Sequence, residues 1–162
     1  MRFWLLDRIC SFEPDAELTA VKSVSLAEEY LADHFPQFPV LPGVFMLESA
    51  AQAAAWLIRM SEDYAHSVVV LKEARSVKFT DFVSPGNSLR MTVAQSGQEG
   101  QERSFTFRGE VDGNQCVSGR LTMHSSNLAT EAPDQAELDA RMIEHFRSVG
   151  SQLMQGVDAS TP

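Results

Sequence analysis

Residues 34–63, HFPQFPVLPGVFMLESAAQAAAWLIRMSED, join a proline-rich loop directly to an alanine-rich segment. Three prolines lie between His34 and Gly43, and because proline fixes φ and carries no amide donor, they exclude a helix interior there. From Gly43 to Asp63 there is no proline and no further glycine, and the strong helix formers Ala, Leu and Met are abundant. The stretch therefore predicts a stiff, extended loop followed by one long helix, whose alanines suit close packing against a sheet.

The sequence on both sides of this helix predicts β structure. Apolar and polar residues alternate over residues 3–25, and the turn signal Glu13-Pro14-Asp15 divides this region into two strands. Four further runs, predicting three or four antiparallel strands, are bounded by the turn signals Pro85-Gly86, Gly97 with Gly100, and Asp112-Gly113. One long helix between a β-rich start and a strand meander predicts an α+β domain in which the sheet wraps around the helix.

The composition changes after Ser126. Residues 127–162 contain six acidic and two basic residues, and their apolar residues recur at helical spacing. The members of this apolar stripe are Leu138, Met142, Phe146, Val149 and Leu153. We therefore expect a domain over residues 1–126 and an acidic extension over residues 127–162, with an amphipathic helix at about 134–155. A stripe of this size is expected to dock on the body of the protein or on a neighbouring subunit.

The length and composition limit the classes of protein and partner. With 162 residues, of which 44% are hydrophobic, the chain has enough apolar material for one buried core. The 22 acidic residues against 13 basic ones give a net charge of -9, which argues against a nucleic-acid partner. Cys10 and Cys116 lie far apart and outside any metal-ligand spacing, so we expect free thiols and no metal or redox cofactor.

We expect a soluble, cytoplasmic protein that does not enter a membrane. The apolar run from Phe3 to Leu6 is too short for a signal-peptide core. The longest apolar stretch, from Gly43 to Met60, carries Glu48 and Arg59, which suits a buried helix better than a bilayer span.

Two ionisable residues, His34 and Glu48, flank the start of the predicted helix. The first turn of a helix has unpaired N–H groups and the positive end of the helix dipole, so the Gly43 N–H could bind and polarise a carbonyl oxygen. A neutral imidazole at His34 could then remove a proton alpha to that carbonyl, while a protonated Glu48 donates to a departing β-hydroxyl. Removal of an α-proton together with protonation of a β-hydroxyl is a dehydration.

Each of these residues also has an ordinary structural interpretation. A lone histidine before a loop is usually a surface or hydrogen-bonded residue. One helical face carries Glu48, Gln52, Ala55 and Arg59, and a face of this kind is typical of a solvated stripe. The arrangement of His34 and Glu48 about the helix start is what favours catalysis.

Three strings, LLDRICSFEP (5–14), HFPQFPVLPGVFMLESAAQA (34–53) and VKFTDFVSPGNSL (77–89), occur in an order and spacing that resemble the FabZ-type (3R)-hydroxyacyl-[acyl carrier protein] dehydratases. The resemblance covers about residues 1–125 and implies a hot-dog fold, in which an antiparallel sheet wraps around one long helix. It implies that the reaction yields a trans-2-enoyl thioester, and a glutamate rather than an aspartate as the acid favours simple dehydration over isomerisation.

The resemblance also implies roles for individual residues. His34 is expected to be the catalytic base and Glu48 the acid, while Gly43 donates to the thioester carbonyl. Val44 and Gln52 are further candidates for substrate binding, and no cofactor is implied.

The partners implied by the resemblance are an acyl carrier protein and a second copy of the chain. Each site of the homodimer would take its histidine from one subunit and its acid from the other, and such dimers can assemble into trimers of dimers. Lys72, Arg75 and Lys78 are candidate contacts for the carrier protein, with a solvated strand face as the alternative.

Two other functions compete with dehydration. A hot-dog thioesterase would also polarise a thioester carbonyl, but it would use a carboxylate to activate water and would release a free thiol without forming an enoyl product. A non-catalytic hot-dog subunit would bind acyl chains or support a partner enzyme, and would turn over no 3-hydroxyacyl thioester.

Overall fold

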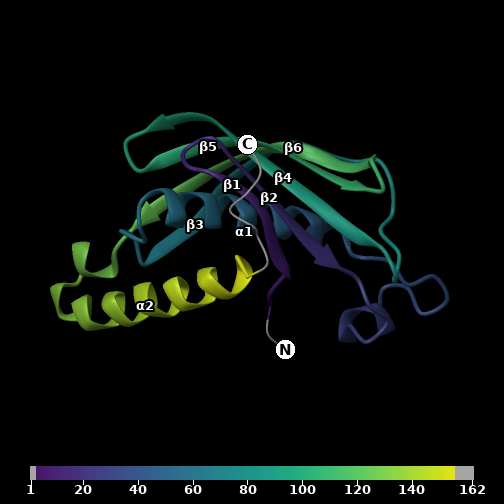
Figure 1. Cartoon of the computed structure of the whole chain (residues 1–162), viewed down its shortest axis with the longest axis horizontal. Coiled ribbons are helices and arrows are strands. Elements are labelled where there is room, and N and C mark those ends of the chain that lie inside the picture. Colours follow the sequence, from purple (N-terminus) through teal and green to yellow (C-terminus); the bar gives the residue numbers. More distant parts are fainter. Residues whose placement is uncertain (1–2, 156–162) are drawn as a thin grey trace.

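The computed structural model describes residues 3–155 and shows one antiparallel sheet curved around a central helix (Figure 1). The strands lie in the order β1-β2-β4-β5-β6-β3, so β1 and β3 are the edges of the sheet. The strands are β1 (Arg8–Glu13), β2 (Glu17–Ser23), β3 (Val68–Phe79), β4 (Ser88–Glu99), β5 (Glu102–Val111) and β6 (Asn114–Ser126). The helices are α1 (Gly43–Ser61) and α2 (Ala136–Leu153), with 3₁₀ turns η1 (Glu29–Ala32), η2 (Leu128–Thr130) and η3 (Pro133–Gln135). The predicted α+β, hot-dog arrangement is confirmed.

The helix α1 lies at the centre of the core because its buried side chains are small or aliphatic. Ala53, Ala54 and Leu57 are fully buried, and they belong to one hydrophobic cluster with Met91 of β4 and Phe105 of β5. Truncating a fully buried leucine to alanine typically costs about 2–5 kcal/mol, so this packing is a main source of stability. The helix predicted from Gly43 onward is confirmed and ends at Ser61.

The predicted strands are present, with turns at or near the predicted signals. Asp15, in the turn between β1 and β2, has a φ of 55°. Asp112 (φ 50°) and Gly113 (φ 82°) adopt the left-handed backbone that a two-residue hairpin between β5 and β6 requires. The expectation that Gly97 belongs to a turn is wrong. This residue lies inside β4, at a shift of register with β5, and the turn comes at Gly100.

The proline-rich loop is confirmed as a loop, but the expectation that it is extended throughout is wrong. Phe35 and Phe38 exchange two backbone hydrogen bonds, with N–O distances of 3.3 and 2.9 Å, so the loop begins with a tight turn. Its second half is fastened to the connection between β3 and β4, where the Leu41 amide donates to the Val83 carbonyl at 2.8 Å. This anchor holds the loop beside the start of α1.

The predicted C-terminal helix is present as α2, but only part of its apolar stripe is packed. Phe146 meets the ring of Trp56 on α1 edge-on at 6.0 Å between centroids, and Leu153 is buried. Leu138, at the other end of the stripe, stays 38% exposed, so this end does not dock on the body of the same chain, and its docking on a neighbouring subunit stays a prediction. No helix within residues 3–155 is long and apolar enough to cross a bilayer.

The first turn of α2 is held by a buried carboxylate. Asp139 accepts a hydrogen bond from the Ser67 hydroxyl, and its two oxygens also accept from the amides of Leu128 (3.0 Å) and Ala129 (2.8 Å). The hydrogen bond from Ser67, supported by the two amides, lowers the pKa of Asp139 against the opposing effect of burial. A polar contact therefore fixes the part of α2 at which apolar packing is weak.

Candidate active site

His34 lines a cavity of about 300 Å³ beside the start of α1. Gly43 and Met46 from α1 share this cavity, and the rings of Phe79 and Phe82 form part of its wall. His34 is half-buried, whereas Phe79 and Phe82 are exposed by 51% and 61%. The structure thus brings together two of the residues expected from the sequence, His34 and Gly43.

A backbone contact determines which nitrogen of His34 can accept a proton. Its Nδ1 lies 3.2 Å from the carbonyl oxygen of Val40 in the same loop. Because a carbonyl oxygen only accepts hydrogen bonds, Nδ1 must carry the hydrogen in this contact. The neutral imidazole then has its free electron pair on Nε2, which is the state that a general base needs.

The start of α1 is suited to binding a carbonyl oxygen. The capping residue is Pro42, which offers no side-chain acceptor to the first amides of the helix. The N–H groups of Gly43 and Val44 therefore lack acceptors within the helix and lie at the positive end of its dipole. A Cβ added at Gly43 would come within 3.1 Å of the Phe79 ring, so glycine at this position allows the ring to close on the helix start. Val44 is 62% exposed at the same helix end.

Glu48 lines a second cavity, of about 380 Å³, between α1 and β3. Its Oε1 accepts a hydrogen bond from Gln52 Nε2 at 3.0 Å. Gln52 is held in turn by the segment before β1, since its Oε1 accepts from the Leu5 amide and its Nε2 donates to the Phe3 carbonyl, both at 3.0 Å. The Glu48 side chain is therefore positioned by Gln52 through its Oε1.

The helical face that carries Glu48 and Gln52 is not a solvated stripe. Ala55 and Arg59 on the same face are only 6% and 7% exposed, and all four residues line the second cavity. The helical spacing places Arg59 on this face but does not predict its burial. Its burial depends on Phe146 of α2, which no pattern within α1 could reveal.

The described part of one chain does not place His34 and Glu48 in a common cavity. His34 lies with Gly43 in the first cavity, whereas Glu48 lies with Gln52 in the second. The base and the acid expected from the sequence therefore occupy separate sites within the monomer.

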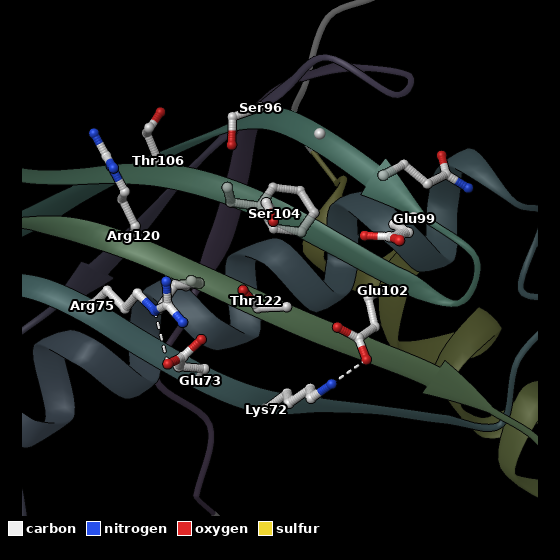
Figure 2. Close-up of a pocket in the computed structure, with 14 residues that line it drawn as sticks. Lys72, Glu73, Arg75, Ser96, Glu99, Glu102, Ser104, Thr106, Arg120 and Thr122 are labelled. Atoms are coloured by element: carbon white, nitrogen blue, oxygen red, sulfur yellow. Dashed lines mark hydrogen bonds and ion pairs between the residues drawn. The ribbon is translucent and has the colours of Figure 1, made fainter.

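Lys72 and Arg75, two of the three basic residues considered for carrier binding, line a hollow of about 910 Å³ on the sheet face turned away from α1 (Figure 2), and Lys78 is not part of its lining. Lys72 is paired with Glu102, and Arg75 Nε lies 2.8 Å from Glu73. These cations thus have acidic partners on a solvated face, and the hollow contains neither His34 nor Glu48.

Cys10 and Cys116 are free thiols, and burial raises the pKa of Cys116. Within residues 3–155, no group of three or more His, Cys, Asp or Glu side chains is placed to hold a metal ion.

The chain is similar in sequence to known dehydratases. The ApeI-like family, described as ApeI dehydratase, matches residues 11–120. The 3-hydroxyacyl-[acyl-carrier-protein] dehydratase FabZ of Streptococcus equi subsp. zooepidemicus is 37% identical over 118 residues, which is 73% of this chain and 84% of that protein.

Solved structures share the fold. One is the dehydratase heterocomplex ApeI:P from Xenorhabdus doucetiae (TM-score 0.66, 24% identity, covering 78% of this chain and 86% of that chain). Another is a hypothetical thioesterase with coenzyme A from Streptococcus pneumoniae TIGR4 (TM-score 0.55, 12% identity, covering 74% of this chain and 84% of that chain). At these identities the likeness shows the fold alone.

The fold and the family match together define a hot-dog enzyme of the dehydratase class. Dehydratases are hydro-lyases. The chain belongs to the ApeI-like dehydratase family, within the FabZ-type hot-dog dehydratases.

Proposed function

We propose that this protein converts a (3R)-3-hydroxyacyl thioester on acyl carrier protein to the trans-2-enoyl thioester, in fatty acid or related acyl-chain synthesis. The observation that carries the proposal is that His34 lines one cavity with Gly43, whose N–H is unpaired at the start of α1. The FabZ relatives, which are named for this reaction, support the same assignment.

The chemistry follows from the donors and acceptors at hand. The thioester carbonyl oxygen accepts from the N–H groups of Gly43 and Val44, which makes the α-hydrogen more acidic. Nε2 of His34 takes that proton, the electron pair forms the α,β double bond, and the bond from the β-carbon to the hydroxyl breaks. Glu48, as the acid, supplies the proton with which the hydroxyl leaves as water.

We further propose that the working site is shared across a homodimer, because His34 and Glu48 line separate cavities in one chain. His34 of one subunit would face Glu48 of the partner subunit. Val70 and Leu71 on the edge strand β3 are 48% and 36% exposed and line the Glu48 cavity, so a partner strand could cover them. Assembly of dimers into trimers of dimers and a cytoplasmic location stay predictions from the sequence.

The test is an assay of enoyl absorbance with 3-hydroxyacyl thioesters of several lengths, each offered on acyl carrier protein and on coenzyme A. We expect enoyl formation by the wild type, and a loss of about a hundredfold or more in both His34→Ala and Glu48→Gln. His145→Ala, which removes an exposed imidazole on α2, is the matched control and should keep full activity. Release of free thiol without an enoyl product would identify a thioesterase instead, and no turnover of any substrate would identify a binding subunit.

A further inference from the structure

Arg59 is buried in the Glu48 cavity, and it has no salt bridge among residues 3–155. Its Nε has no hydrogen-bond partner within this part of the chain. The guanidinium carbon lies 3.9 Å from the ring centroid of Phe146 and 5.9 Å from that of Trp56. Stacking on aromatic rings offsets only part of the cost of burying a charge, because the buried N–H at Nε remains without an acceptor in the described chain.

Two other buried cations of the described chain are neutralised by acids. Arg103, at 6% exposure, lies 2.7 Å from Asp15 and 2.6 Å from Glu62. Lys22, at 5% exposure, lies 2.7 Å from Glu28. Burial lowers the pKa of Arg59 to about 10, so it is still charged at neutral pH. The charge of Arg59 is therefore not neutralised by an acidic side chain of residues 3–155.

The cavity connects Arg59 with the proposed acid. Glu48 and Arg59 are eleven residues apart on one face of α1, which is about 16 Å along the helix axis. Between Glu48 and Arg59, the short side chains of Ala51 and Ala55 leave space beside the helix. Leu71 of β3 is part of the apolar wall. An acyl chain with its thioester end beside Glu48 would run along this wall and end at Arg59.

We propose that Arg59 binds a carboxylate at the distal end of the acyl chain, so that the protein selects acyl chains that end in a carboxylate rather than a methyl group. A planar guanidinium presents paired N–H donors that match the two oxygens of a carboxylate. A methyl end would leave the buried charge unpaired. The direction of the chain in the cavity rests on the proposed function, since the role of Glu48 places the thioester at the opposite end.

The test compares two saturated acyl-pantetheine thioesters of equal length, one with a terminal carboxylate and one with a terminal methyl group. Neither has a 3-hydroxyl, so calorimetry measures binding without turnover. For the full-length wild type we expect the carboxylate form to bind about tenfold or more tightly. Arg59→Met should abolish or reverse this preference, whereas Arg59→Lys, which keeps the charge, should retain part of it.

A role limited to packing against α2 predicts a different result. Phe146→Leu removes the stacked ring but keeps the cation, so it should lower the melting temperature and leave the carboxylate preference in place. Equal binding of both ligands to the wild type, or an Arg59→Met variant with an altered melting temperature and an unchanged preference, would overturn the proposal.

The same ligands with a 3-hydroxyl separate this proposal from the proposed function. If the carboxylate preference is measured but neither hydroxyacyl chain is dehydrated, the dehydratase assignment fails and the Arg59 site stands. If the chains are dehydrated with no preference between their ends, the Arg59 site fails and the dehydratase assignment stands.

Discussion

At His34 one backbone contact selects a tautomer of the imidazole. The Val40 carbonyl lies six residues further along the same loop, and it holds Nδ1 in the donor role. The loop itself is held by the amide of Leu41 on the Val83 carbonyl. The orientation of His34, the proposed base, is therefore set by main-chain groups.

At Gly43 the absence of a side chain matters because Phe79 lies against it. Gly43→Ala should fold, since alanine is a good helix former, but the new Cβ would push the Phe79 ring within the His34 cavity. A small misplacement of reacting groups lowers the rate of the chemical step, so we expect kcat/KM to fall about tenfold to a hundredfold.

The double variant Gly43→Ala/Phe79→Leu is the matched control, with Phe79→Leu alone as its reference. Enoyl absorbance should show that the double variant recovers most of the activity of Phe79→Leu. If Gly43→Ala is as active as the wild type, the contact between Gly43 and Phe79 has no part in shaping the site.

At the scale of elements, α2 is attached by two different kinds of contact. Phe146 and Leu153 pack on the body through apolar surface, while Asp139 fastens the opposite end of the helix through Ser67 and two amides. Gly150 allows α2 to approach α1 closely. A Cβ at this position would lie 3.2 Å from the Trp56 ring and would overlap the Tyr64 hydroxyl.

The carboxylate contact makes the stability of α2 dependent on pH. Because the folded pKa of Asp139 is below its unfolded value of about 3.9, its stabilisation is fully present above about pH 4 and is lost as the pH falls through the folded value. Asp139→Asn should therefore melt at a lower temperature than the wild type at pH 7, and the difference should shrink below pH 4.

Asp134→Asn, which alters an exposed acid just before α2, should match the wild type throughout the same melting series. A constant gap between Asp139→Asn and the wild type from pH 7 to pH 2 would mean that the ionised carboxylate does not stabilise the helix.

The division into a domain of residues 1–126 and an extension of residues 127–162 can be tested by deletion. Removing residues 127–162 takes away the ring stacked on Arg59 and the cover over Trp56. We expect the shortened protein to fold with a lower melting temperature, because the sheet and α1 keep their mutual packing. An unchanged melting temperature and oligomeric state would show that α2 is not a packing element.

At the scale of the whole molecule, the separation of His34 and Glu48 makes the proposed dimer directly testable. His34→Ala and Glu48→Gln should each fold and be nearly inactive. In a mixed dimer one site carries both defects, while the other has an intact His34 and, from the partner subunit, an intact Glu48. Refolding an equimolar mixture should restore about a quarter of wild-type activity, since half the dimers are mixed and each has one working site of two.

Each mutant refolded alone is the control for this mixture, and sedimentation confirms the dimer. A mixture no more active than the separate mutants would place both residues of a working site in one chain, and full activity in either mutant would remove that residue from the mechanism.

Local patterns in the sequence were enough to predict the helices and strands and to place two candidate site residues, His34 and Gly43, near each other. The helix α1 follows from a long run of helix formers after Pro42, and the hairpin of β5 and β6 follows from Asp112-Gly113. His34 and Gly43 could be placed together because only eight residues, three of them prolines, separate them and leave the chain little freedom.

Contacts between segments that are distant in the sequence could be seen only in the folded structure. Arg59 meets Phe146 and Asp139 meets Ser67 across long stretches of chain, and a period of 3.6 residues shows which side chains share a face but not what covers that face. For the same reason the face of Glu48 and Arg59 could be taken for a solvated stripe, whereas packing against β3 and α2 makes it the wall of a cavity. Local sequence patterns thus predict the long helix, the hairpins and the candidate residues His34, Gly43 and Glu48, because these depend on neighbours along the chain. The packing of distant segments decides that His34 and Glu48 line separate cavities and that Arg59 is buried without an acid in the described chain.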